Sequence, residues 1–496
     1  MSNSINSQVV TATKWSAITE IASKLISPIS TMVLARLLTP EAFGVLVTAT
    51  MVISFAEIFT DAGFQKYIIQ HSFKDDESLY KSTAVAFWSN LIFSLFLWIL
   101  ICAFSSQIAH LVGNDGYGLV IAISCVCIPL EAFSSIQMAL FKRKLDFKTL
   151  FIVRIIGIAI PIVITIPLAI VTHSYWSLII GMIALNVCNA VILTVKSDWK
   201  PQWFYDVKLF KDMFSFTIWS MIESITIWLT SYLDVFIVGS ALSAHYIGVY
   251  RTSINIVGQI MNLVTAATTP VLFSALSKLQ DQDTEFKKLF FDFQKMIGML
   301  VIPMGVGIYL FRDLVTEILL GVQWSEAAYM IGWWGLTSAI AIVLSHYCSE
   351  IYRSKGKPKY SVLAQIIHLC FLIPTVLISV KYGFQTLCLS RALVRLTAVA
   401  INFVLVYFLV RITPMEMMRN VWYTCLASFV MTLIFISLPE NSDIFVQFGF
   451  IIVCAITYLS VLCVKKEYRS ILGKFVRLII GKKGKKRISG ENAIDV

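Results

Sequence analysis

Charged residues are scarce in this chain of 496 residues. Lys, Arg, Asp and Glu make up only 14% of the sequence, against about 25% in typical soluble domains, and 58% of the residues are hydrophobic. This composition indicates lipid as the surrounding solvent. The sequence also lacks a GxxxxGK loop, an HExxH motif and a Ser/His/Asp grouping. It therefore gives no support to an ATPase or glycosyltransferase domain, and we expect no catalytic residue and no cofactor.

The cysteines and histidines of the sequence also lack the spacing of metal ligands. The ten cysteines fall in or beside apolar runs, and Cys125 with Cys127 forms only a CxC without a histidine partner. Buried free thiols are the expected state, with neither a metal site nor disulfides. The first residues, MSNSINSQVVTATKW, lack a basic region, so we expect no cleavable signal peptide.

Long apolar runs, in contrast, dominate the chain. A bilayer core needs about 20 apolar residues per helix. Windows of this kind occur near 15–36, 43–65, 82–104, 117–140, 149–171, 174–195, 213–240, 246–274, 290–311, 326–351, 360–380, 384–410, 420–438 and 444–464. The sequence therefore predicts an all-α polytopic membrane protein with fourteen transmembrane helices.

Lysine and arginine test this topology independently. If the connections alternate between inside and outside, starting inside, 32 of the 40 basic residues fall inside. The outside connections hold Arg36, Arg312 and Lys381, and the spans hold Lys24, Arg154, Arg251, Arg391 and Arg395. This asymmetry predicts a membrane protein with an even number of spans and both termini in the cytoplasm. It also explains the net charge of +11 as a topology signal, so no nucleic-acid partner is expected.

A repeat divides the chain. Residues 15–45 align without gaps onto residues 219–249, with nine identities that include Trp-Ser at one end and Gly-Val (Gly44 and Gly248) at the other. We expect two six-helix lobes related by a pseudo-two-fold axis along the membrane normal, a recurrent transporter plan. The predicted parts are 1–212 for spans 1–6, 213–412 for spans 7–12, 413–464 for two extra C-terminal helices, and 465–496 for a basic amphipathic tail on the inner leaflet's lipids.

Several segments carry a family resemblance. ARLLTPEAFG (35–44), DAGFQKYIIQ (61–70), LFKRKLDFK (140–148) and LDVFIVGSALSAHYIGVY (233–250) with TTPVLFSALSKLQ (268–280) resemble Wzx-type, WzxC-like flippases. These belong to the multidrug/oligosaccharidyl-lipid/polysaccharide exporter superfamily. The resemblance implies that undecaprenyl-pyrophosphate-linked oligosaccharide moves from the cytoplasmic to the periplasmic leaflet by alternating access. A polysaccharide polymerase or chain-length machinery is a further expected partner. The resemblance supplies no catalytic motif, so candidate sites come from the residues.

Two arginines in one span are the first candidates. Arg391 and Arg395 lie one helical turn apart, near mid-depth in the window 384–410. Guanidinium groups bind phosphate oxygens bidentately, so this pair could grip a diphosphate. The alternative is that each pairs with a carboxylate in another span and holds helices together.

Three further basic residues could line a glycan and diphosphate cavity. Lys24 follows Glu20 by one turn, which favours a local ion pair. Arg154 lies near the inner rim, where snorkelling to headgroups and recruitment of the incoming diphosphate are both compatible with its position. Arg251 lies near the outer rim.

Carboxylates in the spans could carry a proton or Na⁺, or act as counter-ions for the arginines. These candidates are Glu20, Glu57, Asp61, Glu131 and Glu223. Asp234 lies inside a family signature, so we expect a gating or structural role for it, as for Gly44 and Gly248.

Other functions remain open from the sequence. A multidrug/cation antiporter of the same superfamily is expected to have twelve spans and a cavity rich in carboxylates. A peptidoglycan-precursor (lipid II) flippase would share the fourteen spans. A membrane polymerase or ligase of lipid-linked sugars is least favoured, because the sequence has no large outside loop.

Overall fold

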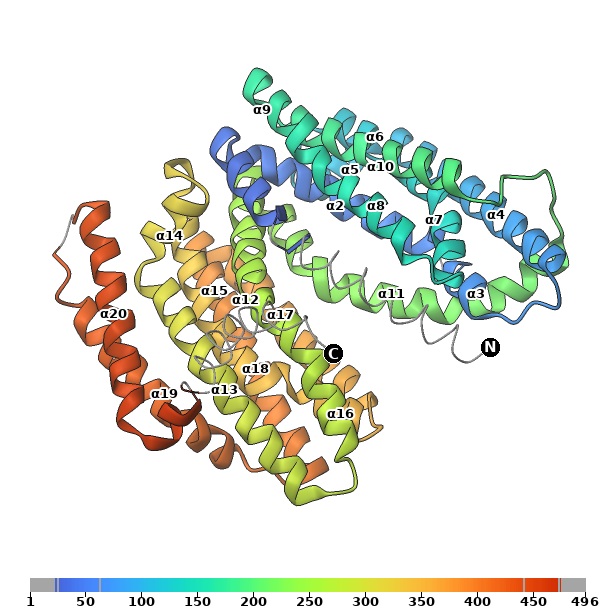
Figure 1. The fold of residues 1–496 in the computed structure, drawn as a ribbon. Coiled ribbons are helices and arrows are strands. Elements are labelled where there is room, and N and C mark those ends of the chain that lie inside the picture. The colour runs from blue at the N-terminus through green and yellow to red at the C-terminus, as the bar shows by residue number, and fades with distance from the viewer. Residues whose placement is uncertain (1–22, 25, 62–63, 440–441, 472, 474–496) are drawn as a thin grey trace, which may run out of the picture. The chain divides into compact units, whose positions relative to one another are not determined.

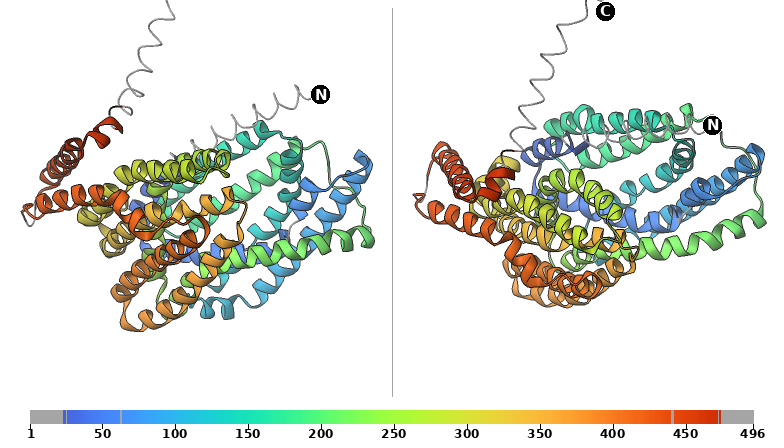
Figure 2. Two further views of the ribbon diagram at one scale, coloured as in Figure 1. Left: turned by 90° about the horizontal axis from the view of Figure 1, so that it is seen from below. Right: turned by 60° about the horizontal axis from the view of Figure 1, so that its bottom comes forward.

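The computed structural model describes residues 23–24, 26–61, 64–439, 442–471 and 473, and in these residues every regular element is helical (Figure 1). Two further views of the ribbon show coiled segments joined by short connections (Figure 2). The all-helical prediction is therefore confirmed for the described residues. Glu20 and residues 472 and 474–496 of the predicted amphipathic tail lie outside them.

The helices of the N-terminal part follow the predicted windows closely. Their bounds are α2 Pro40–Asp61, α3 Phe64–Gln70, α4 Asp76–Ala103, α5 Ser105–Leu111, α6 Gly118–Ser124, α7 Cys127–Arg143, α8 Phe147–Ile160, the π-helical turn η1 Pro161–Thr165, α9 Ile166–Thr172 and α10 Trp176–Lys196. Proline starts α2, where its missing N–H costs nothing. At α4 a capping box satisfies the first turn, with Ser78 N donating to Asp75 Oδ1 at 2.7 Å.

The C-terminal part is built in the same way. Its elements are α11 Val207–Ala241, α12 Ala244–Lys278, α13 Asp283–Leu310, α14 Arg312–Leu319, η2 Val322–Trp324, α15 Ala327–Ala341, the π-helical η3 Ile342–His346, α16 Cys348–Ser354, α17 Lys359–Ser379, η4 Val380–Tyr382, α18 Phe384–Val410, α19 Pro414–Phe435 and α20 Ile444–Val464. At α19 a second capping box, Thr413 with Glu416, fixes the start of the helix behind Pro414.

Twelve helices of the described residues are long and apolar enough to cross a membrane. The two remaining predicted windows, 15–36 and 213–240, contain the shorter apolar helices Ile26–Leu37 and Ile227–Ala241. A multi-pass helical fold is therefore established. The count of fourteen membrane crossings stays a prediction.

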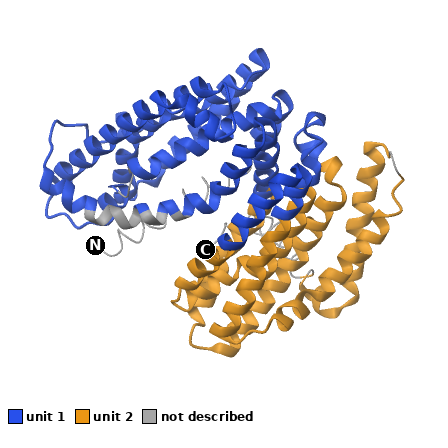
Figure 3. Ribbon diagram, turned by 180° about the vertical axis from the view of Figure 1, so that it is seen from behind, with its two compact units in different colours: residues 1–259, 316–330, 369–391 blue, residues 260–315, 331–368, 392–496 orange. Residues whose placement is uncertain are grey.

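By compactness the chain divides into two units (Figure 3). Unit 1 comprises residues 1–259, 316–330 and 369–391, and unit 2 comprises residues 260–315, 331–368 and 392–496. Unit 1 has an apolar core where α3, α4 and α7 meet, around Phe64, Phe87 and Ile136. In unit 2, α20 is fixed to α13 by Tyr458, whose hydroxyl donates to Met299 O at 2.7 Å. The predicted domain boundaries at 212 and 412 stay a prediction.

Candidate functional site

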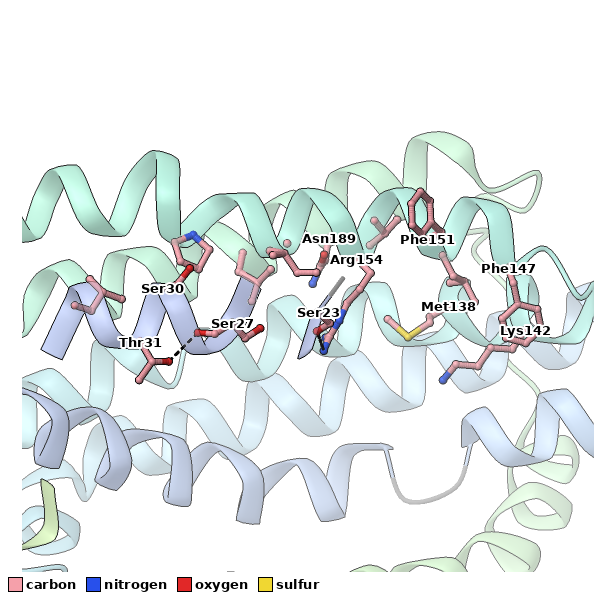
Figure 4. Close-up of a pocket in the computed structure, with 17 residues that line it drawn as sticks. Ser23, Ser27, Ser30, Thr31, Met138, Lys142, Phe147, Phe151, Arg154 and Asn189 are labelled. Atoms are coloured by element: carbon pink, nitrogen blue, oxygen red, sulfur yellow. Dashed lines mark hydrogen bonds between the residues drawn. The ribbon is translucent and has the colours of Figure 1, made fainter. Parts of the chain in front are cut away.

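A polar cavity lies in unit 1 between the first described helix, α7, α8 and α10 (Figure 4). Its volume is about 740 Å³. Among the residues that line it are the polar side chains Ser23, Ser27, Ser30, Thr31, Lys142, Arg154 and Asn189. Apart from these the lining is largely apolar, so the polar groups determine what the cavity can bind.

The hydroxyl groups come from one helical face. Ser23, Ser27 and Ser30 are spaced by four and three residues, which aligns them along one side of the first described helix. A row of hydroxyls in an apolar helix offers both donors and acceptors, as a sugar or phosphate requires.

Arg154 supplies one of the two positive charges in the lining of this cavity. It lies two turns into α8, whose start is capped by Asp146, with Thr149 N donating to Asp146 Oδ1 at 3.1 Å. The Arg154 Nη2 atom donates to Ser23 Oγ at 3.1 Å, and Figure 4 shows both side chains beside Asn189. Arg154, one of the predicted substrate-binding residues, therefore lines a cavity and does not lie on a flat helix surface.

Lys142, at the end of α7, also lines this cavity. Its Nζ atom donates to Gln65 Oε1 at 3.4 Å. Two residues on, Lys144 Nζ lies 2.6 Å from Asp198 Oδ2 in the connection after α10. The hydrogen bond to Asp198 raises the pKa of Lys144, and the same bond lowers the pKa of the Asp198 carboxyl. The ion pair links the ends of two helices that line the cavity.

Arg391 occupies a buried ion pair in unit 1. Its Nε donates to Asp234 Oδ2 at 2.9 Å and to the Tyr250 hydroxyl at 3.0 Å. The Tyr250 hydroxyl donates to the same Asp234 oxygen at 2.8 Å. All three residues are buried, with 9% of Arg391 exposed. This is the carboxylate partner that the helix-gluing alternative requires. Tyr250 was not singled out from the sequence, although it ends the signature that contains Asp234.

Arg395 belongs to unit 2 and has different neighbours. Its Nη1 donates to Ser338 Oγ at 2.7 Å, and its guanidinium lies 4.4 Å from the ring centroid of Trp334. A stacked guanidinium on an indole face is a cation–π contact that leaves the group cationic. Arg395 is half-buried.

Arg251 is anchored near the start of α12 in unit 1. Its Nη1 donates to Ser231 O at 3.1 Å, and its guanidinium lies 5.0 Å from the Tyr232 ring centroid. The Tyr232 ring stacks on Trp228, whose Nε1 donates to Ser54 Oγ at 3.1 Å. The structure thus joins Arg251 to an aromatic row rather than to Arg154 or Lys142.

The remaining candidates are scattered. Lys24 and Glu57 are half-buried in unit 1, and Glu131 is exposed on α7. The side chains of Asp61 and Glu223 lie outside the described residues. The ion-coupling role of these carboxylates stays a prediction. In the described part of the chain, no three His, Cys, Asp or Glu residues are grouped as a metal site.

The two glycines of the repeat lie against each other. A Cβ atom added to Gly44 on α2 would overlap the carbonyl oxygen of Ala244, and one added to Gly248 on α12 would overlap that of Pro40. Glycine is therefore required at both positions by close backbone approach.

Comparison with known proteins identifies the family. The family described as "Polysaccharide biosynthesis protein" matches residues 33–329, which is more than half of the chain. The chain belongs to this family of polysaccharide biosynthesis proteins.

Two curated proteins are similar to this polysaccharide biosynthesis protein over most of its length. A Klebsiella pneumoniae protein named "Uncharacterized membrane protein in cps region" is 23% identical over 408 residues, 82% of each chain. The Escherichia coli (strain K12) "Lipopolysaccharide biosynthesis protein WzxC" is 20% identical over 329 residues, 65% of each chain. The predicted resemblance to WzxC-like proteins is thereby confirmed.

Solved structures agree on the fold. The lipid II flippase MurJ in an inward closed conformation matches with a TM-score of 0.72 at 16% identity, over 92% of this chain and 99% of that one. An inward-facing multidrug resistance MATE family transporter of the MOP superfamily matches with a TM-score of 0.59 at 14% identity, over 80% and 98%. This polysaccharide biosynthesis protein therefore shares its fold with these two proteins.

Proposed function

We propose that the protein is a flippase that carries an undecaprenyl-pyrophosphate-linked oligosaccharide from the cytoplasmic to the outer leaflet of the bacterial inner membrane. The observation that carries this proposal is the cavity around Arg154, because it combines a guanidinium, a lysine and a row of hydroxyls within apolar helices. Membership of a polysaccharide biosynthesis family supports the same class of substrate.

The chemistry of the cavity suits the headgroup of such a lipid. A guanidinium forms bidentate hydrogen bonds to phosphate oxygens, and it is always charged. Serine and asparagine side chains can serve as both donors and acceptors for sugar hydroxyls. The polyprenyl tail needs no polar partner and can stay in the lipid. In this scheme Arg154 and Lys142 receive the diphosphate, and Ser23, Ser27 and Asn189 contact the first sugars.

The proposed topology places this cavity toward the cytoplasm. If the chain crosses the membrane fourteen times with both termini inside, Lys142 lies at the inner end of its span. Arg154 then lies within reach of the headgroups of the inner leaflet. Two six-helix lobes then alternate access, and the last two helices stand beside them. A polymerase or chain-length partner would receive the oligosaccharide on the outer side.

The test is translocation of lipid-linked oligosaccharide in vesicles that contain the purified protein. We expect Arg154→Gln to reduce the rate by about tenfold to a hundredfold, equivalent to the loss of one charge-assisted hydrogen bond to phosphate of about 1.5–3 kcal/mol. Lys148→Gln is the matched control, since Lys148 is an exposed cation on the same helix and does not line the cavity.

Two results would contradict this proposal. Unchanged transport by Arg154→Gln at normal protein level would refute the proposed headgroup site. Movement of lipid II at the rate of the oligosaccharide lipid would refute the proposed substrate and favour a peptidoglycan-precursor flippase.

A further inference from the structure

A hydrogen-bonded cluster joins three segments of unit 1. It lies at the helix ends that the predicted topology places on the outer side of the membrane. His245 Nδ1 lies 2.7 Å from Glu41 Oε1, and His245 Nε2 lies 2.9 Å from Glu326 Oε2. Glu41 is in the first turn of α2, His245 in the first turn of α12, and Glu326 directly precedes α15. The imidazole thus bridges two carboxylates on separate elements.

A bridge with two hydrogen bonds requires one proton more than a neutral imidazole and two ionised carboxylates carry. A neutral imidazole has one N–H and an ionised carboxylate has none, so the neutral ring can donate to only one of the two partners. Both contacts become hydrogen bonds when one more proton is held, which makes the ring an imidazolium donating from both nitrogens. Among the described residues, Glu41 and Glu326 are the charged groups facing the ring, and the neighbouring Tyr246 presents its ring at 5.3 Å.

The helices at this bridge also meet at their backbones. Gly44 approaches the carbonyl of Ala244, and Gly248 approaches the carbonyl of Pro40. Each partner is 204 positions from its counterpart, the same offset that aligns the repeat, and Glu41 and His245 are separated by 204 positions as well. Such reciprocal contacts are typical of surfaces that meet across a two-fold axis. The contact therefore closes α2 against α12 with no space for a side chain.

The segment that carries Glu326 is fixed independently. Trp324 Nε1 donates to Ala35 O at 2.7 Å, and Gln323 Nε2 donates to Leu38 O at 2.8 Å. These acceptors are carbonyls at the end of the helix Ile26–Leu37, where no intrahelical donor follows. Glu326 is thus held in place, and His245 ties it to α2.

We propose that Glu41, His245 and Glu326 form a proton-dependent latch that keeps α2 and α12 together at this end of the transporter. When the proton is lost, the ring can donate to only one of the two carboxylates. In the molecules where it donates to Glu326, the starts of α2 and α12 are no longer tied and can separate about their glycine contact. The inference rests on the proposed function only in that transport requires this end to open. It needs no substrate to be tested.

The experiment measures the separation of the two helix starts directly. Spin labels at Thr39 and Ser243, both exposed, report the distance by pulsed electron paramagnetic resonance in the full-length protein in lipid nanodiscs. One proton held only in the closed state changes the ratio of closed to separated molecules by up to about tenfold per pH unit. We expect one short distance at about pH 5.5 and a second, longer distance at about pH 8.5, on either side of the usual histidine range.

Variants assign the effect to the bridge. His245→Gln should show the longer distance at both pH values, and His245→Lys, a fixed cation, should show the short distance at both. His110→Gln is the matched control, because His110 also contacts a carboxylate, Asp115 at 2.9 Å, but lies outside the bridge. It should keep the pH dependence of the parent.

Two results would overturn the latch. One is a parent protein whose distance does not change between the two pH values. The other is a His245→Gln variant that retains the pH response of the parent. Because the measurement uses no lipid-linked sugar, a failed latch would leave the headgroup site at Arg154 standing, and the reverse also holds.

Discussion

The Arg391 guanidinium lies 2.9 Å from the Asp234 carboxylate, within a buried group completed by the Tyr250 hydroxyl. Removal of one partner of a buried ion pair leaves an uncompensated charge and costs about 3–5 kcal/mol, whereas its replacement by apolar side chains is often neutral. Arg391 and Asp234 therefore stabilise the interior of unit 1 only when both are present.

The first prediction follows from this pair. Arg391→Met should lower the amount of folded protein in the membrane, because Asp234 stays buried without its partner. The double variant Arg391→Met with Asp234→Leu should restore the amount and keep transport, as measured by fluorescence-detected chromatography and by vesicle transport. A double variant that is abundant but inactive would instead assign Arg391 to the substrate.

Arg395 should behave differently. Arg395→Ala should abolish transport at normal protein level if this guanidinium contacts diphosphate. Arg395→Lys should restore only part of the activity, since an ammonium lacks the planar fork that binds Ser338 and stacks on Trp334. Ser338→Ala is the control, because it removes the hydrogen bond to Arg395 and keeps the positive charge of the guanidinium. Full activity of Arg395→Ala would remove this residue from the site.

The glycine contact gives a third prediction. Gly44→Ala or Gly248→Ala should destabilise the protein by about 1–3 kcal/mol, because the added methyl overlaps a carbonyl oxygen and forces α2 from α12. Gly258→Ala is the matched control on α12, because a Cβ there meets no atom within 4 Å. Thermal unfolding of the three variants in detergent measures the difference. Equal melting temperatures would contradict the close approach.

The topology can be tested by labelling single added cysteines with an impermeant reagent in intact cells. Positions near Lys144, Lys200, Lys288 and Lys357 should be protected, and positions near Asn114, Ser243 and Asn441 should react. The reason is the placement of the basic residues on the inner side. If positions near Lys144 and Asn114 react alike, the fourteen-helix topology is wrong.

Much of the fold was predictable because membrane helices depend on local sequence. A helix in lipid satisfies its own backbone hydrogen bonds, so long apolar windows correspond to helices one by one. The window 384–410 matches α18 at both ends. The window 117–140 was less accurate, since a break at Cys125 divides it into α6 and α7. Apolar composition does not show where a helix is interrupted.

The partners of the intramembrane charges could not be predicted in the same way. Arg391 and Asp234 are 157 positions apart, and only the folding of unit 1 brings them together. Arg154 and the serine row are likewise separated by more than a hundred residues before the fold assembles the cavity. The spacing of Ser23, Ser27 and Ser30 is the sequence signal for this polar helix face.

The sequence by itself determined the helical membrane fold and the family, because these properties follow from apolar length and short motifs. Tertiary structure decided which charges meet. It paired Arg391 with a carboxylate, gave Arg154 a cavity and placed His245 between two glutamates. Contacts between helices that are distant in the sequence depend on how whole helix faces pack. No short stretch of the sequence specifies that packing.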